Sequence, residues 1–122
     1  MNRLQHFLRA KTQFGLHSPF VYRLYTEVLF SRAGGRGRSF ADVVWRLEEY
    51  YGLPHTDALP NTRQLTLDTR DGLFLVIDRP HRDEALWQSL CDDDSYQVTL
   101  DLYDVGIAVN SPRLSRQHFL LR

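Results

Sequence analysis

Hydrophobic residues in the first half of the chain recur at the three- and four-residue spacing of amphipathic helices. Leu4, Phe7, Leu8 and Phe14 follow this spacing and predict a first short helix that ends near Gly15. The same period continues in two further stretches, so the first half of the chain is predicted to be helical.

A second helix is predicted to begin after Ser18, whose hydroxyl can accept a hydrogen bond from a free backbone amide. Pro19 then occupies the first helical position, where the missing amide proton costs no hydrogen bond. The apolar face of this helix consists of Phe20, Val21, Leu24, Val28 and Leu29. This pattern favours a capping role for Ser18 over that of a catalytic nucleophile, and it leaves His17 without an assigned role.

A third helix is predicted from Ser39, as its cap, to Gly52. Its apolar stripe consists of Phe40, Val43, Val44, Leu47 and Tyr51. The stretch before it contains three glycines together with Arg36 and Arg38. A phosphate-binding loop follows a strand, whereas this stretch follows a helix. We therefore predict a mobile linker, with anion binding through Arg36 and Arg38 as the alternative.

The second half of the chain changes to the two-residue period of β-strands. Arg63 to Thr69 alternates weakly and precedes a turn signal at Asp71-Gly72. Leu73 to Ile77 is a continuous apolar run, which is typical of a strand buried on both faces. Two strands joined by a turn are therefore expected here.

A short helix is predicted from Asp83, as its cap, to Cys91, with Leu86, Trp87 and Leu90 facing inward. Tyr96 to Leu102 and Val105 to Val109 then alternate on either side of a short turn, which predicts a hairpin. The closing "HFLL" predicts one more short strand.

These elements predict an α/β fold with an α+β-like arrangement. N-terminal helices pack on a small mixed sheet of about four strands that ends in an antiparallel hairpin. We expect one domain over 1–122, with a helical segment at 1–52, a linker and short strand at 53–72, and a strand, helix and hairpin at 73–122. At 122 residues, such a domain can form a core without disulfides.

Composition narrows the function classes without selecting one. The 15 basic and 15 acidic residues balance, so no overall field attracts nucleic acid or an anionic membrane. Cys91 is the single cysteine, so one chain has no disulfide and no cysteine-based zinc site. The N-terminal stretch is interrupted by charges and predicts neither a signal peptide nor a membrane span. A reducing, cytoplasmic location is the expectation.

Three blocks of the chain resemble, in order, a family of bacterial class I methyltransferases that use S-adenosylmethionine. They are "KTQFGLHSPFVYRLYTEV" (Lys11 to Val28), "VVWRLEEYYGLP" (Val43 to Pro54) and Leu73 to Arg122, which includes "DLYDVGIAV" and "QHFLLR". Together they cover roughly three quarters of the chain. The resemblance implies that Leu73 begins the equivalent of the family's fifth strand.

The stretch from Leu53 to Asp71 departs from this family. Family members place their first four strands there, with the glycine-rich loop that receives the cofactor, yet a single strand-helix-strand unit needs about 30 residues. Neither that loop nor the acidic residue that would bind the ribose is present. We therefore expect no cofactor and no metal.

The family tends to carry Asp-Asp-x-His after its fifth strand, and this chain has Asp78-Arg79-Pro80-His81 there. Asp78 and His81 are thus candidates for a general base and its partner. The alternative is that Asp78 only ends a strand and His81 only precedes a helix. Without a cofactor or a nucleophile, the second interpretation is favoured.

The leading hypothesis is a non-catalytic interaction module derived from a methyltransferase, with no membrane association and no enzymatic activity. A homodimer is expected for two reasons. The strand that would flank the Leu73 strand in the family is missing, which leaves its edge open, and the helices carry more aromatic residues than a small sheet can bury. The interface candidates are His17, Phe20, Tyr25 and Trp45. The alternatives are a methyltransferase that completes its site with another chain, and phosphate or nucleic-acid binding through Arg32, Arg36 and Arg38.

Overall fold

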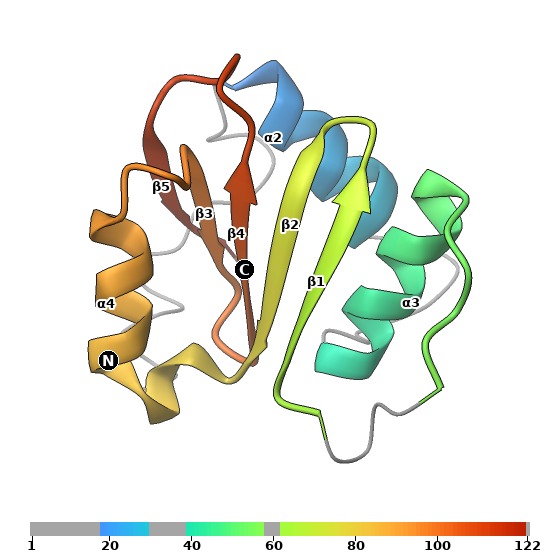
Figure 1. Cartoon of the computed structure of the whole chain (residues 1–122), viewed down its shortest axis with the longest axis horizontal. Helices are drawn as coiled ribbons and strands as arrows, with labels where there is room; N and C mark the ends of the chain where they lie inside the picture. Colours follow the sequence, from blue (N-terminus) through green and yellow to red (C-terminus); the bar gives the residue numbers. More distant parts are fainter. Residues whose placement is uncertain (1–17, 30–38, 58–61, 122) are drawn as a thin grey trace.

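The computed structural model describes residues 18–29, 39–57 and 62–121 of the chain (Figure 1). Its helices are α2 (Pro19–Leu24), which continues as the π-helical turn η2 (Tyr25–Leu29), then α3 (Phe40–Tyr51), the 3-10 turn η4 (Pro80–Arg82) and α4 (Glu84–Asp92). Its strands are β1 (Gln64–Thr69), β2 (Gly72–Asp78), β3 (Val98–Asp101), β4 (Val105–Asn110) and β5 (Gln117–Leu120).

The strands form one five-stranded sheet in the order β1-β2-β4-β3-β5. All neighbours are antiparallel except β3 and β5, which are parallel. The predicted mixed sheet is thereby confirmed. The β3–β4 hairpin lies beside β2 as expected, and the weakly alternating stretch before Asp71 supplies the edge strand β1.

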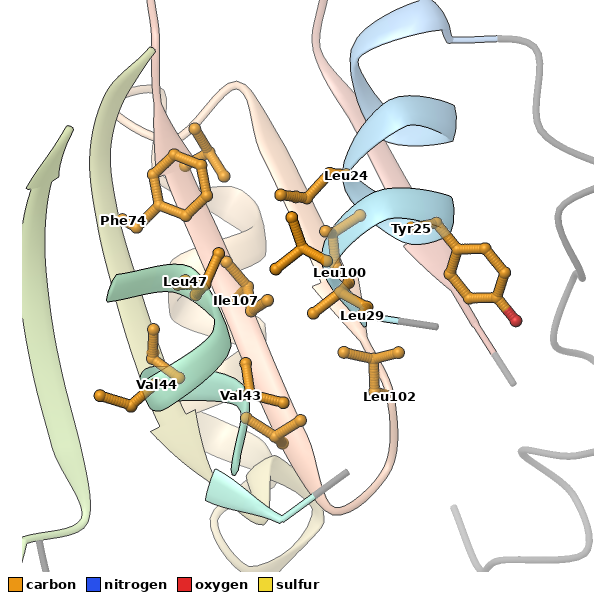
Figure 2. Close-up of a cluster of buried hydrophobic side chains, with 14 of the residues drawn as sticks. Leu24, Tyr25, Leu29, Val43, Val44, Leu47, Phe74, Leu100, Leu102 and Ile107 are labelled. Carbon is orange, nitrogen blue, oxygen red and sulfur yellow. The ribbon is translucent and has the colours of Figure 1, made fainter. Parts of the chain in front are cut away.

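Helices cover both faces of this sheet. The buried face of α2, η2 and α3 packs on the side of the sheet that carries Phe74, Leu100 and Ile107 (Figures 1 and 2). Gly106 is adjacent to Ile107 in β4 and therefore faces the opposite side. There the ring of Trp87 from α4 lies directly against Gly106, so α4 covers the second face.

The hydrophobic core lies between the first two helical elements and the sheet. Figure 2 shows Leu47 of α3 and Leu24 of α2 pointing toward side chains of the central strands. The side chains of Phe74, Leu100 and Ile107 are fully buried. Burying a side chain of this size contributes about 1.5 to 3 kcal/mol, so this layer dominates the stability of the domain.

Local capping fixes the helix ends, as the sequence predicts. The Ser18 hydroxyl accepts a hydrogen bond from the Val21 amide at 3.3 Å, and the Ser39 hydroxyl accepts one from the Asp42 amide at 3.2 Å. Gly52 ends α3 with a left-handed φ of 67°. Asp83 caps α4 through the Leu86 amide at 3.0 Å.

A two-residue loop, Arg70–Asp71, joins β1 to β2 in a tight hairpin. The Thr69 hydroxyl accepts a hydrogen bond from the Asp71 amide at 3.1 Å and donates one to the Gly72 carbonyl at 2.8 Å. The Asp71 carboxylate accepts hydrogen bonds from Tyr51 at 2.8 Å and Arg23 at 3.1 Å. The hairpin is therefore bound to both α3 and α2. Burial, together with the hydrogen bond to Asp71, raises the pKa of Tyr51.

Three details of the predicted pattern are wrong. The Leu73 strand does not lack a neighbour, because β1 pairs with β2 along its length, from Gln64 opposite Ile77 to Thr69 opposite Gly72. Leu73 is 41% exposed, since α4 does not reach that end of the second face. Leu86 faces solvent at 40% exposure, so of the three predicted inner residues of α4 only Leu90 and part of Trp87 face the sheet.

Candidate functional site

Asp78 lines a pocket of about 250 Å³ at the carboxyl end of β2. The pocket also receives Arg63, which precedes β1, and Arg82, which precedes α4. These residues converge because β1 and β2 are antiparallel neighbours, so the start of one strand lies beside the end of the other. Arg79 follows Asp78 in the left-handed conformation, with φ of 47°, and its amide donates to the Asp104 carbonyl at 2.9 Å.

His81, the predicted partner of Asp78, does not point into this pocket. Its ring stacks on the ring of Tyr103 with centroids 4.1 Å apart, and its Nδ1 donates to the Tyr103 carbonyl at 3.0 Å. Within the described ranges, Asp78 and His81 form no hydrogen bond with each other. The arrangement that a base and its partner require is therefore not assembled, and His81 instead fixes the turn between β3 and β4.

The apolar wall of the pocket depends on a glycine. A Cβ at Gly106 would overlap the ring of Trp87 at 2.6 Å and approach Pro80 at 3.1 Å. Only glycine leaves room for the indole to lie this close to β4. The pocket is thus lined by an aromatic ring in a fixed position and by the three arginines Arg63, Arg79 and Arg82.

A second candidate site lies on the outer surface of α3, around Trp45. The indole is 53% exposed, the largest exposed fraction of any large hydrophobic side chain in the described ranges. The imidazole of His55 stacks on it, with ring centroids 5.3 Å apart and planes 5° from parallel. We call Trp45 and His55 the aromatic pair.

Two carboxylates on α3 hold His55 in place. Its Nε2 lies 2.7 Å from Glu49 Oε1, and its Nδ1 lies 3.4 Å from Glu48 Oε1. Glu48 is only 1% exposed and also accepts hydrogen bonds from the amide and hydroxyl of Thr56 at 3.0 and 2.8 Å. The hydrogen bond to Glu49, followed by the one to Glu48, raises the pKa of His55 above its ordinary value.

Of the predicted interface residues in the described ranges, only Trp45 is exposed. Tyr25 is 3% exposed, and Phe20 packs edge-on against Phe74 with centroids 6.3 Å apart. Both belong to the core of this chain because their helix covers the sheet. His17, Arg32, Arg36 and Arg38 lie outside the described residues.

A hydrogen-bonded chain of three side chains links α4, β3 and β5 on the second face. Cys91 Sγ lies 3.6 Å from Thr99 Oγ1, which lies 2.6 Å from His118 Nδ1. Burial raises the pKa of the Cys91 thiol and lowers the pKa of His118. Each shift favours the uncharged form of its group, the opposite of what a thiolate and imidazolium pair requires.

Residues 18–29, 39–57 and 62–121 contain no cluster of three or more histidine, cysteine or acidic side chains that would hold a metal ion. None of their helices is long and apolar enough to cross a membrane. No protein-family model, curated protein or solved structure matches the chain.

The sequence interpretation did not include Arg63, Arg82 and His55 among the site residues. Arg82 follows Arg79 by three residues in the same turn, whereas Arg63 reaches them only after β1 and β2 pair. For His55 a signal was present. It follows the Gly52 cap by three residues, and a chain that leaves a helix through a left-handed glycine can fold back on its last turn.

Proposed function

We propose that the chain is a non-catalytic interaction module related to class I methyltransferases, and that it forms a homodimer through the aromatic pair. The observation that carries this proposal is the exposure of Trp45 in a fixed orientation. Tryptophan is enriched among the residues that contribute most to binding energy at protein interfaces.

The aromatic pair is ordered before any partner arrives. Trp45 is held by the stacked His55, and His55 is held by Glu48 and Glu49. A side chain that is already ordered loses less conformational entropy on binding. The self-complementary contact of a two-fold dimer would cover the indole in both copies.

The position of β1 supports a non-catalytic role. In the methyltransferase family that the sequence resembles, a parallel sheet with the cofactor loop would flank β2. Here antiparallel β1 covers that edge, and it connects to β2 by a two-residue loop. The β3–β4 hairpin lies beside β2, which is the arrangement that the resemblance of Leu73 to Arg122 to the family's last strands implies.

A cytoplasmic location is part of the proposal. It is supported by the single cysteine, Cys91, whose partly buried thiol has a raised pKa and little tendency to form disulfides.

Light scattering at micromolar concentration tests the proposal. We expect the parent protein to have twice the 14.3 kDa mass of one chain, and Trp45→Ala to have the mass of one chain. Tyr22→Ala is the matched control, because Tyr22 is also a half-exposed aromatic residue on a helix, and it should remain dimeric. A monomeric parent protein would overturn the homodimer.

A second variant separates the helix surface from strand pairing. The Arg63 carbonyl accepts a hydrogen bond from the Asp78 amide. Because hydrogen-bonded positions alternate along an antiparallel pair, Leu65 and Leu67 also bond to β2, whereas the amide of Thr66 points away from β2. Thr66→Pro should block pairing along that edge with the β1–β2 ladder intact. We expect this variant to remain dimeric. If Thr66→Pro were monomeric and Trp45→Ala remained dimeric, the interface would be assigned to β1.

A further inference from the structure

The pocket at the carboxyl end of β2 combines unpaired positive charge with an apolar wall. The guanidinium groups of Arg63 and Arg82 make no hydrogen bond or ion pair with the described residues. Both side chains are exposed and line the pocket together with Arg79. Three arginines around one cavity produce a local positive potential in a chain without net charge.

The two acidic residues of the pocket, Asp78 and Asp83, offset only part of this charge. The Asp83 carboxylate caps α4 by accepting the Leu86 amide at 3.0 Å. The Asp78 carboxylate lies 3.8 Å from Nε of Arg79. Three arginines against two carboxylates leave the lining with a net positive charge, and neither carboxylate forms an ion pair with Arg63 or Arg82 within the described residues.

The pocket is also lined by apolar side chains that are held in place. Ile77 is buried at the end of β2, and the ring of Trp87 is held against Gly106. Leu86, which also lines the pocket, is 40% exposed. A flat apolar group can contact this wall while a charged group attached to it reaches the arginines.

Backbone geometry also marks this end of the sheet. Arg79 adopts a left-handed conformation that residues other than glycine rarely occupy. Its amide is bound to the Asp104 carbonyl, which fixes the turn and directs the chain from β2 into η4. Such conformations are concentrated at ligand sites, where the surrounding structure maintains them.

We infer that this pocket binds a small organic anion, a carboxylate or phosphate monoester carried on a planar ring. Arg63 and Arg82 would bind the anionic group, and Trp87 would contact the ring. Arginine suits both anions because its planar guanidinium can donate two parallel hydrogen bonds to either of them. This inference goes beyond the proposed interaction module and is independent of the dimer, since the aromatic pair does not line this pocket.

The intrinsic fluorescence of Trp87 provides the test. The chain has two tryptophans, so Trp45→Phe leaves Trp87 as the only one. The probes are phenyl phosphate and benzoate, with benzyl alcohol as the uncharged ring and inorganic phosphate as the anion without a ring. We expect saturable changes with one or both aromatic anions, and affinities at least about tenfold weaker for the two control compounds.

The relative response to the two aromatic anions identifies the source of the ligand. Stronger binding of phenyl phosphate indicates a phosphate monoester, and stronger binding of benzoate indicates a carboxylate. Binding should weaken as salt rises from about 0.05 to 0.5 M, because the arginines are exposed.

Arginine variants in the same background locate the site. Arg63→Gln and Arg82→Gln should each raise the dissociation constant about tenfold. Arg113→Gln is the matched control, because Arg113 is exposed and does not line this pocket, and it should leave the constant unchanged. The inference is overturned if neither aromatic anion gives a saturable change, if benzyl alcohol binds equally well, or if Arg113→Gln has the same effect as the other two variants.

Discussion

His55 shows how one side chain can connect a loop, a helix and an exposed surface. It bonds to two consecutive glutamates of α3 and stacks on Trp45, although its own side chain remains 41% exposed. Its position depends on charge, because an imidazolium donates from both ring nitrogens, whereas a neutral imidazole donates from only one. The geometry of the aromatic pair should therefore respond to pH.

The direction of this response follows from the raised pKa of His55. A histidine whose pKa is higher in the folded state binds protons more tightly there, so its stabilising contribution is complete below the ordinary value of 6.5. The contribution is lost as pH rises through the raised pKa. We expect His55→Gln to lower the free energy of unfolding below pH 6.5, with the difference from the parent protein shrinking toward alkaline pH.

Urea unfolding at a series of pH values measures this difference. His81→Gln is the control for the loss of an imidazole elsewhere in the chain. A constant difference between His55→Gln and the parent protein at all pH values would contradict the role of the charged imidazole.

Residues whose roles depend on neighbours in the chain could be predicted from the sequence. Ser18, Ser39 and Gly52 act within one helical turn, so their types and positions suffice. His81 and Leu86 could not be placed in this way. His81 stacks on Tyr103, which is distant in the sequence. The exposure of Leu86 depends on how α4 packs on the sheet.

At the scale of elements, α3 is the helix whose sequence is most consistent with its structure. A serine cap, an apolar stripe and a terminal glycine all agree with its bounds from Phe40 to Tyr51. The π-helical turn η2, which continues α2, was not predicted. It keeps Tyr25, Val28 and Leu29 buried after α2, and this one-residue change of hydrogen-bond spacing leaves no clear signal in the hydrophobic pattern.

The capping of α3 can be tested directly. Ser39→Ala removes the acceptor for the Asp42 amide and should lower the free energy of unfolding by about 1 kcal/mol. Chemical denaturation with an unchanged m-value would show that only stability is affected. Ser115→Ala, at an exposed position outside any helix, should change stability by less than about 0.5 kcal/mol. Equal losses for both variants would contradict the cap.

The whole molecule is a sheet covered by α2, η2 and α3 on one face and by α4 on the other. The sequence predicted this class of fold because helical and strand periods occupy separate halves of the chain. It did not predict that β1 would pair along the full length of β2, because the alternation of β1 is weak and its outward residues Thr66 and Asp68 are polar. Pairing here is specified by the turn and by backbone hydrogen bonds.

The candidate pocket depends on this global pairing. It is formed only when the start of β1, the end of β2 and the first turn of α4 come together. Asp78 was identified through the resemblance, since it follows the equivalent of a family strand. Arg63 was not, because only the pairing of β1 with β2 brings it beside Asp78, although Arg79 and Arg82 follow Asp78 closely in the sequence.

The tight β1–β2 hairpin also has a consequence for the order of folding. A two-residue loop closes at little entropic cost, and hairpins form within about 1 to 10 μs. The parallel pair β3–β5 closes a longer loop, because β4 and the connection after it lie between the two strands in the sequence. We expect the hairpin to be formed in the transition state and β5 to join afterwards. Thr69→Ala, which removes both hydroxyl bonds of the turn, should then mainly slow refolding in stopped-flow experiments. Leu120→Ala in β5 should mainly accelerate unfolding, and the reverse pattern would place the nucleus at the parallel edge.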